Sequence, residues 1–298
     1  MKPRIWTLLA LLALAGNAGA QSGPDRYATL PAVSPDGRWI AYVRDFSQDS
    51  SELHVVGMDG AGDRVLRSGG PGGVPGWADR GRRVTMALSN RDSSTLWSMG
   101  LDGAETRALA ARRGHALSLS NDGKRVAWSV GDWRRSRLMV SDVDGRRARA
   151  LTDSASGWFN IAWSPDDRRL AASHLDSTGA MQVWIVEVAS GHAEPLTGFA
   201  ASEGRPQWPS WSPDGKRVAV QAGHYDREHP EKNEADVWIV EVASGHAAKL
   251  GTRTGVWMDE TPAWSPEGKR IVFQSTRTGR FEIWSAKVDG TDARQVTR

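Results

Sequence analysis

The chain of 298 residues contains no cysteine. This absence rules out disulfides, thiolate catalysis and zinc sites built on cysteine. Stability must therefore come from a buried core, and a chain of this length can bury one without cross-links. Because no thiol is present, an oxidising compartment is tolerated.

Long apolar runs are lacking after the first twenty residues. Lys2 and Arg4 form a charged start, residues 5–15 are an apolar run, and residues 18–20 (Ala-Gly-Ala) resemble a cleavage site. We interpret residues 1–20 as a secretory signal peptide, cleaved near Ala20 and too short to span a membrane comfortably. No cysteine follows it to carry a lipid, so we expect a periplasmic or secreted protein without a membrane span.

A strong net charge is also lacking. The formal charge of +3 falls to +1 once Lys2 and Arg4 are removed with the signal peptide. Nucleic-acid binding needs a concentrated basic field, and a nearly balanced chain does not indicate one. We therefore predict no nucleic-acid partner.

Common catalytic motifs are missing from the sequence. It has no G-x-S-x-G elbow, no H-E-x-x-H pair, no P-loop and no G-x-G-x-x-G. Ser, His and Asp are present, but a catalytic triad is recognised by its geometry. The sequence therefore identifies no catalytic residue, leaves enzyme activity open and favours a protein without it.

What the chain does contain is a short turn motif that occurs six times, each time before a strand-like run, at intervals of 42 to 53 residues. Pro presets the backbone for the second position of a type I turn, while Asp or Asn and then Gly suit the next two. A period of this length, with about four short strands in each repeat, is typical of a β-propeller. The turns are Ser34–Gly37, Ala78–Gly81, Ser120–Gly123, Ser164–Asp167, Ser212–Gly215 and Ser265–Gly268.

We therefore predict an all-β fold, a six-bladed β-propeller of four-stranded antiparallel blades, as one domain over residues 21–298. In the last repeat, residues 269–274 and 281–286 have the composition and alternation of strands, and residues 293–297 form a weaker one. Each repeat completes its own four strands. Ring closure should therefore rest on side-chain packing between the first and last blades, with residues 22–31 as a clasp.

Tryptophans recur at equivalent positions of the repeats, which favours packing between neighbouring blades over stacking on a sugar or cofactor. One set lies in the third strand and the other just before the turn. The sets are Trp97, Trp184, Trp238 and Trp284, and Trp77, Trp163, Trp211 and Trp264.

The whole pattern resembles the TolB-type propeller repeat (PD40), a relative of WD-type repeats. The likeness lies in the W-S-P-D-G-K turn at Trp211–Lys216, the following KRVAV strand, the I-W strand, the D-G turn and the closing L-T seen at Leu151-Thr152. It covers nearly all of the chain after the signal peptide. The resemblance implies a propeller, here expected without the separate N-terminal domain of TolB and without a peptidase domain.

Antiparallel blades have two different faces. The turns between first and second strands and between third and fourth strands lie on one face, which we name the turn face. The loops between second and third strands and the connections between blades lie on the other, the loop face. Because the loop-face segments vary most, we expect binding there, around the central channel. The candidates are Arg26, Tyr27, His115, Trp158, Asn160, Glu203, Arg205, Trp257, Asp259 and Glu260.

The longest of these loops, residues 224–234, holds two histidines and several carboxylates. They lack the spacing of a metal site, so partner contact is the favoured role. No cofactor is indicated, although a divalent cation held in the channel by Asp259 or Glu260 stays open.

Two functions remain. The first is a binding or scaffold protein, expected to be monomeric, that recognises a periplasmic or envelope protein, or a glycan, through the loop face. The alternative is a small glycan lyase or hydrolase with its site at the channel, using Glu203, Asp259, Glu260 or His115.

Overall fold

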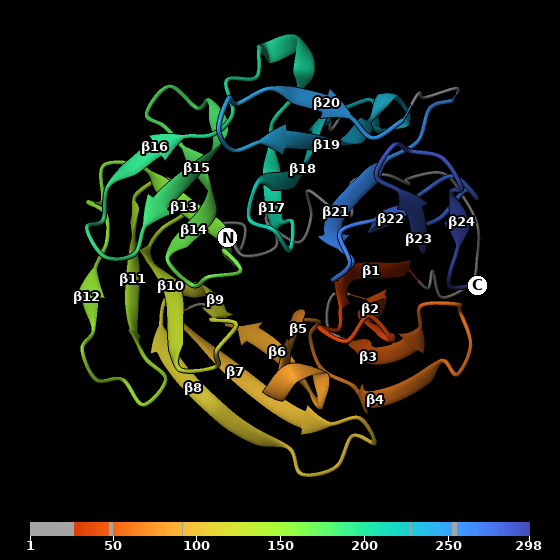
Figure 1. The fold of residues 1–298 in the computed structure, drawn as a ribbon, viewed down its shortest axis with the longest axis horizontal. Helices are drawn as coiled ribbons and strands as arrows, with labels where there is room; N and C mark the ends of the chain where they lie inside the picture. The colour runs from red at the N-terminus through yellow and green to blue at the C-terminus, as the bar shows by residue number, and fades with distance from the viewer. Residues whose placement is uncertain (1–26, 48–49, 91, 227, 252–254) are drawn as a thin grey trace.

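Six four-stranded antiparallel sheets stand around a central axis in the computed structural model (Figure 1). The structure describes residues 27–47, 50–90, 92–226, 228–251 and 255–298, so Arg26 and the predicted signal peptide lie outside the described residues. Each sheet is built from four consecutive strands, which confirms the predicted all-β, six-bladed propeller.

The first three blades contain β1 to β12. Blade 1 is β1 (Tyr27–Val33), β2 (Trp39–Ser47), β3 (Ser50–Gly57) and β4 (Arg64–Ser68). Blade 2 is β5 (Val74–Ala78), β6 (Arg83–Ser89), β7 (Ser93–Gly100) and β8 (Arg107–Arg113), with the 3₁₀ turn η1 (Asp79–Gly81). Blade 3 is β9 (His115–Leu119), β10 (Arg125–Gly131), β11 (Ser136–Asp142) and β12 (Arg149–Ala150).

The last three blades contain β13 to β24. Blade 4 is β13 (Gly157–Trp163), β14 (Arg169–Leu175), β15 (Met181–Glu187) and β16 (Ala193–Pro195). Blade 5 is β17 (Gln207–Trp211), β18 (Arg217–His224), β19 (Glu234–Glu241) and β20 (Ala247–Lys249), with η2 (Ala201–Glu203) before it and η3 (Pro230–Lys232) inside it. Blade 6 is β21 (Asp259–Trp264), β22 (Arg270–Ser275), β23 (Glu282–Lys287) and β24 (Arg294–Gln295).

The repeated turn is closed by its serine. In Ser34–Gly37 the Gly37 N–H donates to the Ser34 carbonyl at 2.8 Å, and the Ser34 hydroxyl donates to Asp36 at 2.6 Å. The hydroxyl oxygen of Ser34 also accepts the Trp39 N–H at 2.9 Å, so this one side chain connects both strands of the hairpin. Gly37 has φ +72°, a conformation that glycine adopts without strain.

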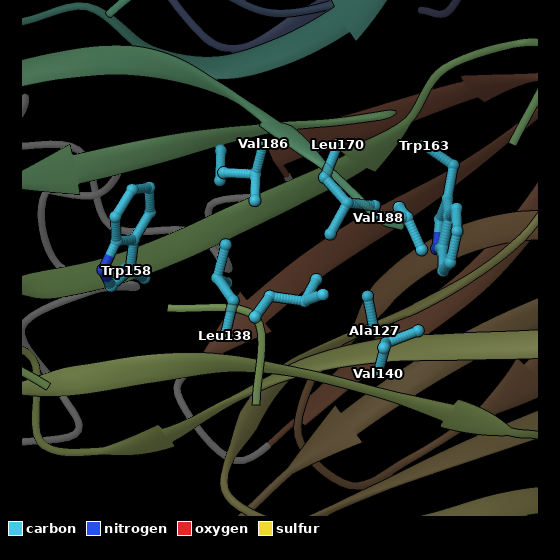
Figure 2. Close-up of a cluster of buried hydrophobic side chains, with 10 residues drawn as sticks. Ala127, Leu138, Val140, Trp158, Trp163, Leu170, Val186 and Val188 are labelled. Atoms are coloured by element: carbon cyan, nitrogen blue, oxygen red, sulfur yellow. The ribbon is translucent and has the colours of Figure 1, made fainter. Parts of the chain in front are cut away.

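The core lies between the blades. Figure 2 shows one such layer, in which Leu138 and Val140 of β11 face Leu170, Val186 and the indole of Trp163 from blade 4. Since each blade is covered on both faces by its neighbours, its central strands are apolar on both sides.

The tryptophans before the turns make these inter-blade contacts, as predicted. The indole N–H of Trp211 in blade 5 donates to the Ala162 carbonyl of blade 4 at 3.3 Å. The guanidinium of Arg169, also from blade 4, lies 4.8 Å from the centre of the same ring. Trp163 repeats both contacts one blade earlier, with Ser118 and Arg125.

The ring closes between blades 1 and 6. Ala28, Ile40 and Tyr42 of blade 1 pack against Val272 and Ile283 of blade 6, and all five are buried. The Ala28 N–H donates to the Phe281 carbonyl at 3.0 Å. Closure by side-chain packing is thereby confirmed. Of the proposed clasp, residues 27–31 belong to β1 and residues 22–26 lie outside the described part of the chain.

Candidate functional site on the loop face

The innermost strands surround the axis, and five of the six carry a β-bulge at the same place. Each bulge puts one residue at φ between 48° and 55°, a costly conformation for a residue with a side chain. Only β5 pairs with its neighbour without a register shift. The five residues are Leu30, Ala116, Asn160, Trp208 and Thr261.

Two glutamines stabilise the bulges of blades 1 and 6. The Leu30 N–H donates to Gln274 Oε1 at 2.9 Å, and the Thr261 N–H donates to Gln221 Oε1 at 2.8 Å. Each glutamine belongs to the second strand of the preceding blade. These buried amides therefore join blades 5, 6 and 1 next to the axis.

Glu260 lies at the centre of this network, with 1% of its surface exposed. The Tyr225 hydroxyl donates to its Oε1 at 2.7 Å, and the Gln274 amide donates to its Oε2 at 2.9 Å. The Gln221 amide in turn donates to the Tyr225 oxygen at 3.1 Å. Both carboxyl oxygens accept hydrogen bonds, an arrangement that suits the ionised form.

Burial opposes that ionised form and raises the pKa of Glu260 to about 7, although the bonds from Tyr225 and Gln274 lower it. Burial and the Glu260 charge raise the pKa of Tyr225, so its hydroxyl keeps its proton. The Tyr225 to Glu260 bond also fixes the start of the long loop after β18 against blade 6.

Asp259, the preceding residue, has different partners. Its Oδ2 accepts from Arg277 Nη2 at 2.6 Å and from the Trp257 indole at 3.3 Å. The Arg277 guanidinium also lies 5.2 to 5.5 Å from the ring centres of Trp257, Phe273 and Trp284. Asp259 is therefore the buried counter-charge of an arginine held among aromatic rings.

Seven of the ten predicted candidates fall into two groups in the structure. Tyr27, Trp257, Asp259 and Glu260 belong to blades 6 and 1 or the connection before them, and Tyr27 packs edge-on to Phe281 with ring centres 6.3 Å apart. His115, Trp158 and Asn160 belong to blades 3 and 4, across the ring (Figure 1). These predicted candidates therefore lie on opposite sides of the ring.

The blade 3 and 4 group is mostly buried. The ring of Trp158 packs against that of His174 in a tilted arrangement, with centres 4.4 Å apart, and His174 packs likewise against Trp184 at 4.6 Å. Burial lowers the pKa of both His115 and His174, so both stay neutral at pH 7. These residues pack the seam between blades 3 and 4.

Glu203 and Arg205 are the exposed candidates, on the connection between blades 4 and 5. Glu203 accepts the Ala200 N–H at 2.8 Å, and the Arg205 N–H donates to the Gly223 carbonyl at 3.1 Å. The connection is therefore held in place while the charged end of Arg205 is open to solvent.

The sequence reasoning missed Tyr225, Gln221, Gln274 and Arg277. A signal existed for the glutamines, because each interrupts an apolar second strand at the same repeat position. Within the described ranges, no group of three or more His, Asp or Glu side chains is placed to hold a metal ion. None of the helices among those residues is long and apolar enough to cross a membrane.

The arrangement defines a class of protein: a six-bladed propeller with varied loops on one face and buried inter-blade polar groups. The family model of the TolB beta propeller domain matches residues 123–298. The chain therefore belongs to the TolB beta propeller family.

Two curated relatives are similar in sequence. An uncharacterised Agrobacterium fabrum protein is 25% identical over 229 residues, covering 71% of this chain and 77% of its own. The Tol-Pal system protein TolB of Anaeromyxobacter dehalogenans is 29% identical over 220 residues, covering 70% of this chain. The match spans only 45% of that TolB protein.

Two solved structures show the same fold. TolB from Acinetobacter baumannii superposes with a TM-score of 0.63 at 20% identity, covering 94% of this chain and 65% of that one. Oligogalacturonate lyase from Vibrio parahaemolyticus superposes with a TM-score of 0.57 at 11% identity, covering 89% and 92%.

Proposed function

We propose that the protein is an exported β-propeller of the cell envelope that binds a segment of another protein through its loop face. Residues 1–20 would act as the signal peptide. The proposal rests on a difference in exposure and bonding between the candidate residues. Asp259 and Glu260 are bound by neighbouring side chains, whereas Glu203 and Arg205 present charge on a fixed, exposed connection.

The TolB relative supports a protein partner, since it is a protein of the Tol-Pal system. Loops held on a rigid ring can bind a peptide without reorganising the scaffold. We propose a monomer as the binding unit.

Site-specific photo-crosslinking in the native periplasm tests this function. A photoreactive residue at position 205 should give a covalent adduct with a partner protein. The matched control is position 216, where Lys216 is exposed on the turn face. An adduct at 205 and none at 216 supports the proposal, whereas adducts at neither position, or only at 216, contradict it.

The second candidate is a glycan lyase or hydrolase, and Glu260 is the observation that favours it. A carboxyl group with a pKa of about 7 suits general acid–base catalysis at neutral pH. Because Glu260 is 1% exposed, substrate could reach it only after Tyr225 moves away.

Oligogalacturonate is the substrate to test first, by the ultraviolet absorbance of the unsaturated product that a lyase forms and by the reducing ends that either a lyase or a hydrolase releases. Turnover that is lost in Glu260→Gln would support the enzyme. If the unmodified protein forms no product, activity as a lyase or hydrolase on oligogalacturonate is excluded.

A further inference from the structure

We propose that the outer edge of blades 2 and 3 is a second interaction surface, which docks the protein on an anionic phospholipid membrane. This surface is separate from the loop-face connection that carries Glu203 and Arg205, and the proposal does not depend on the protein partner bound there.

The near-zero net charge of the chain conceals a strong local asymmetry. From β8 to β12, residues 107–150 contain eleven basic side chains and four acidic ones, a net charge of +7. The rest of the chain therefore carries a formal net charge of −4. The residues outside this basic sector are therefore net acidic.

The positive charge in this sector is exposed. We name the arginine patch as the eight exposed arginines of β8, the β10–β11 loop, β11 and the turn into β12. They are Arg107, Arg113, Arg134, Arg135, Arg137, Arg146, Arg147 and Arg149.

Few of these arginines are neutralised by carboxylates. Arg147 pairs with Asp142 at 2.8 Å, and Arg146 lies 3.5 Å from Asp144. Arg149 donates to the Val188 carbonyl. The other five make no ion pair with any described residue.

Arg112 connects the β8 part of the patch to the turn between β11 and β12. Its Nη2 donates to the Asp142 and Val143 carbonyls, both at 2.9 Å, and to the Ser141 hydroxyl at 3.0 Å. The end of β8 is therefore held against the turn that carries Arg146 and Arg147, and Figure 1 shows this end of the strand next to blade 3. Arg113 follows directly in the chain.

The loop at the other end of β11 adds an aromatic group. Trp133 is 38% exposed, one of the few large apolar side chains at the surface of the described chain. The Arg134 guanidinium lies 4.5 Å from its ring centre. An indole beside arginines suits the boundary between headgroups and acyl chains.

The chemistry of the basic residues points to phosphate. Ten of the eleven are arginine, whose planar fork binds phosphate oxygens in pairs. Each basic residue near an anionic membrane increases partitioning by about five-fold. Concentrated like charge without counter-ions destabilises a compact protein, and an anionic surface removes that cost.

Vesicle co-sedimentation of the purified mature protein tests the proposal. Vesicles of phosphatidylglycerol in phosphatidylethanolamine should bind the protein, and vesicles of pure phosphatidylcholine should not. Added salt should weaken binding, because it screens the charges. The double variant Arg134→Gln/Arg135→Gln should bind about 25-fold more weakly, and Trp133→Ser should also bind more weakly.

The matched control is Arg168→Gln/Arg294→Gln, which removes two exposed arginines outside the patch. It should change vesicle binding by less than about two-fold. Equal binding to anionic and neutral vesicles would overturn the proposal, as would equal losses in the two double variants. Patch-dependent binding to duplex DNA without vesicle binding would overturn it in favour of a different polyanion.

Discussion

At the scale of single residues, Glu260 is a carboxyl group that the fold buries while supplying donors to both of its oxygens. The donors favour the charge and burial opposes it, and burial has the larger effect on its pKa. Protonation changes what this group can bond, because the neutral form carries a proton donor on one of its two oxygens.

Protonation of Glu260 should make stability depend on pH. Its pKa rises from an unperturbed 4.5 to about 7 on folding, so between these values the folded protein holds a proton that the unfolded chain has lost. The free energy of unfolding should therefore fall as pH rises from 4.5 to 7, by roughly 3 kcal/mol, and then level off.

Urea unfolding at pH 5 and pH 8 checks this, with Glu260→Gln beside the unmodified protein. The variant should lose most of the difference between the two pH values. If both proteins show the same difference, Glu260 is not the titrating group.

Sequence could place Asp259 and Glu260 on the channel side of a propeller, because the repeat register fixes their position. It could not show that they point to different partners, since that depends on Tyr225 and Arg277 arriving from loops of other strands. The sequence could not predict the bulges either, because Leu, Ala, Asn, Trp and Thr share no side-chain property that marks a bulge.

At the scale of elements, the turn and the tryptophan before it act together. The serine hydroxyl closes the hairpin in every blade except blade 2. In blades 2, 4 and 5 an indole N–H also ties the hairpin to the preceding blade. These features were predictable because they repeat. Blade 2 departs from the pattern where its turn motif is degraded: Asp79 and Arg80 both take positive φ and form η1.

Trp211→Phe tests the inter-blade role. The substitution keeps an aromatic ring but removes the bond to Ala162 and weakens the stacking with Arg169, so it should cost about 1 to 2 kcal/mol of stability.

The control is Trp133→Phe, an exposed ring that should change stability by less than about 0.5 kcal/mol. Chemical denaturation measures both variants. Equal effects would contradict a specific contribution of Trp211.

At the scale of the whole molecule, the seam between blades 1 and 6 decides whether the ring stays closed. Arg44 of β2 donates to the Arg298 carbonyl at 3.2 Å and lies 3.9 Å from the fully buried Glu282. Arg280 and Thr297 complete the partners of that carboxylate, at 2.8 and 2.5 Å. The apolar part of the seam could be expected from the repeat, but not this ionic part, because it has no counterpart in the repeated motif.

Arg44→Met should destabilise the protein by about 2 kcal/mol, since it leaves a buried carboxylate with fewer partners. Arg38→Met removes an exposed arginine paired with Asp36 and should cost less than about 0.5 kcal/mol. Thermal and urea unfolding of both variants would measure this, and a similar cost for the two would show that the seam contact is no stronger than a surface pair.

The charge distribution is the other property of the whole molecule. A single net charge suggested an even surface, and it failed to show the arginine patch because positive and negative residues cancel between sectors. Counting charge blade by blade would have shown the basic sector from the sequence alone.

The assignment of each sheet to four consecutive strands has a consequence for biosynthesis. No blade needs a strand from the far end of the chain, so each sheet can form as soon as its own residues have been synthesised. Only the joining of the two end blades must wait for the last repeat. Most of the native pairing is therefore of low contact order, and the slowest structural event should be the final sealing of the ring.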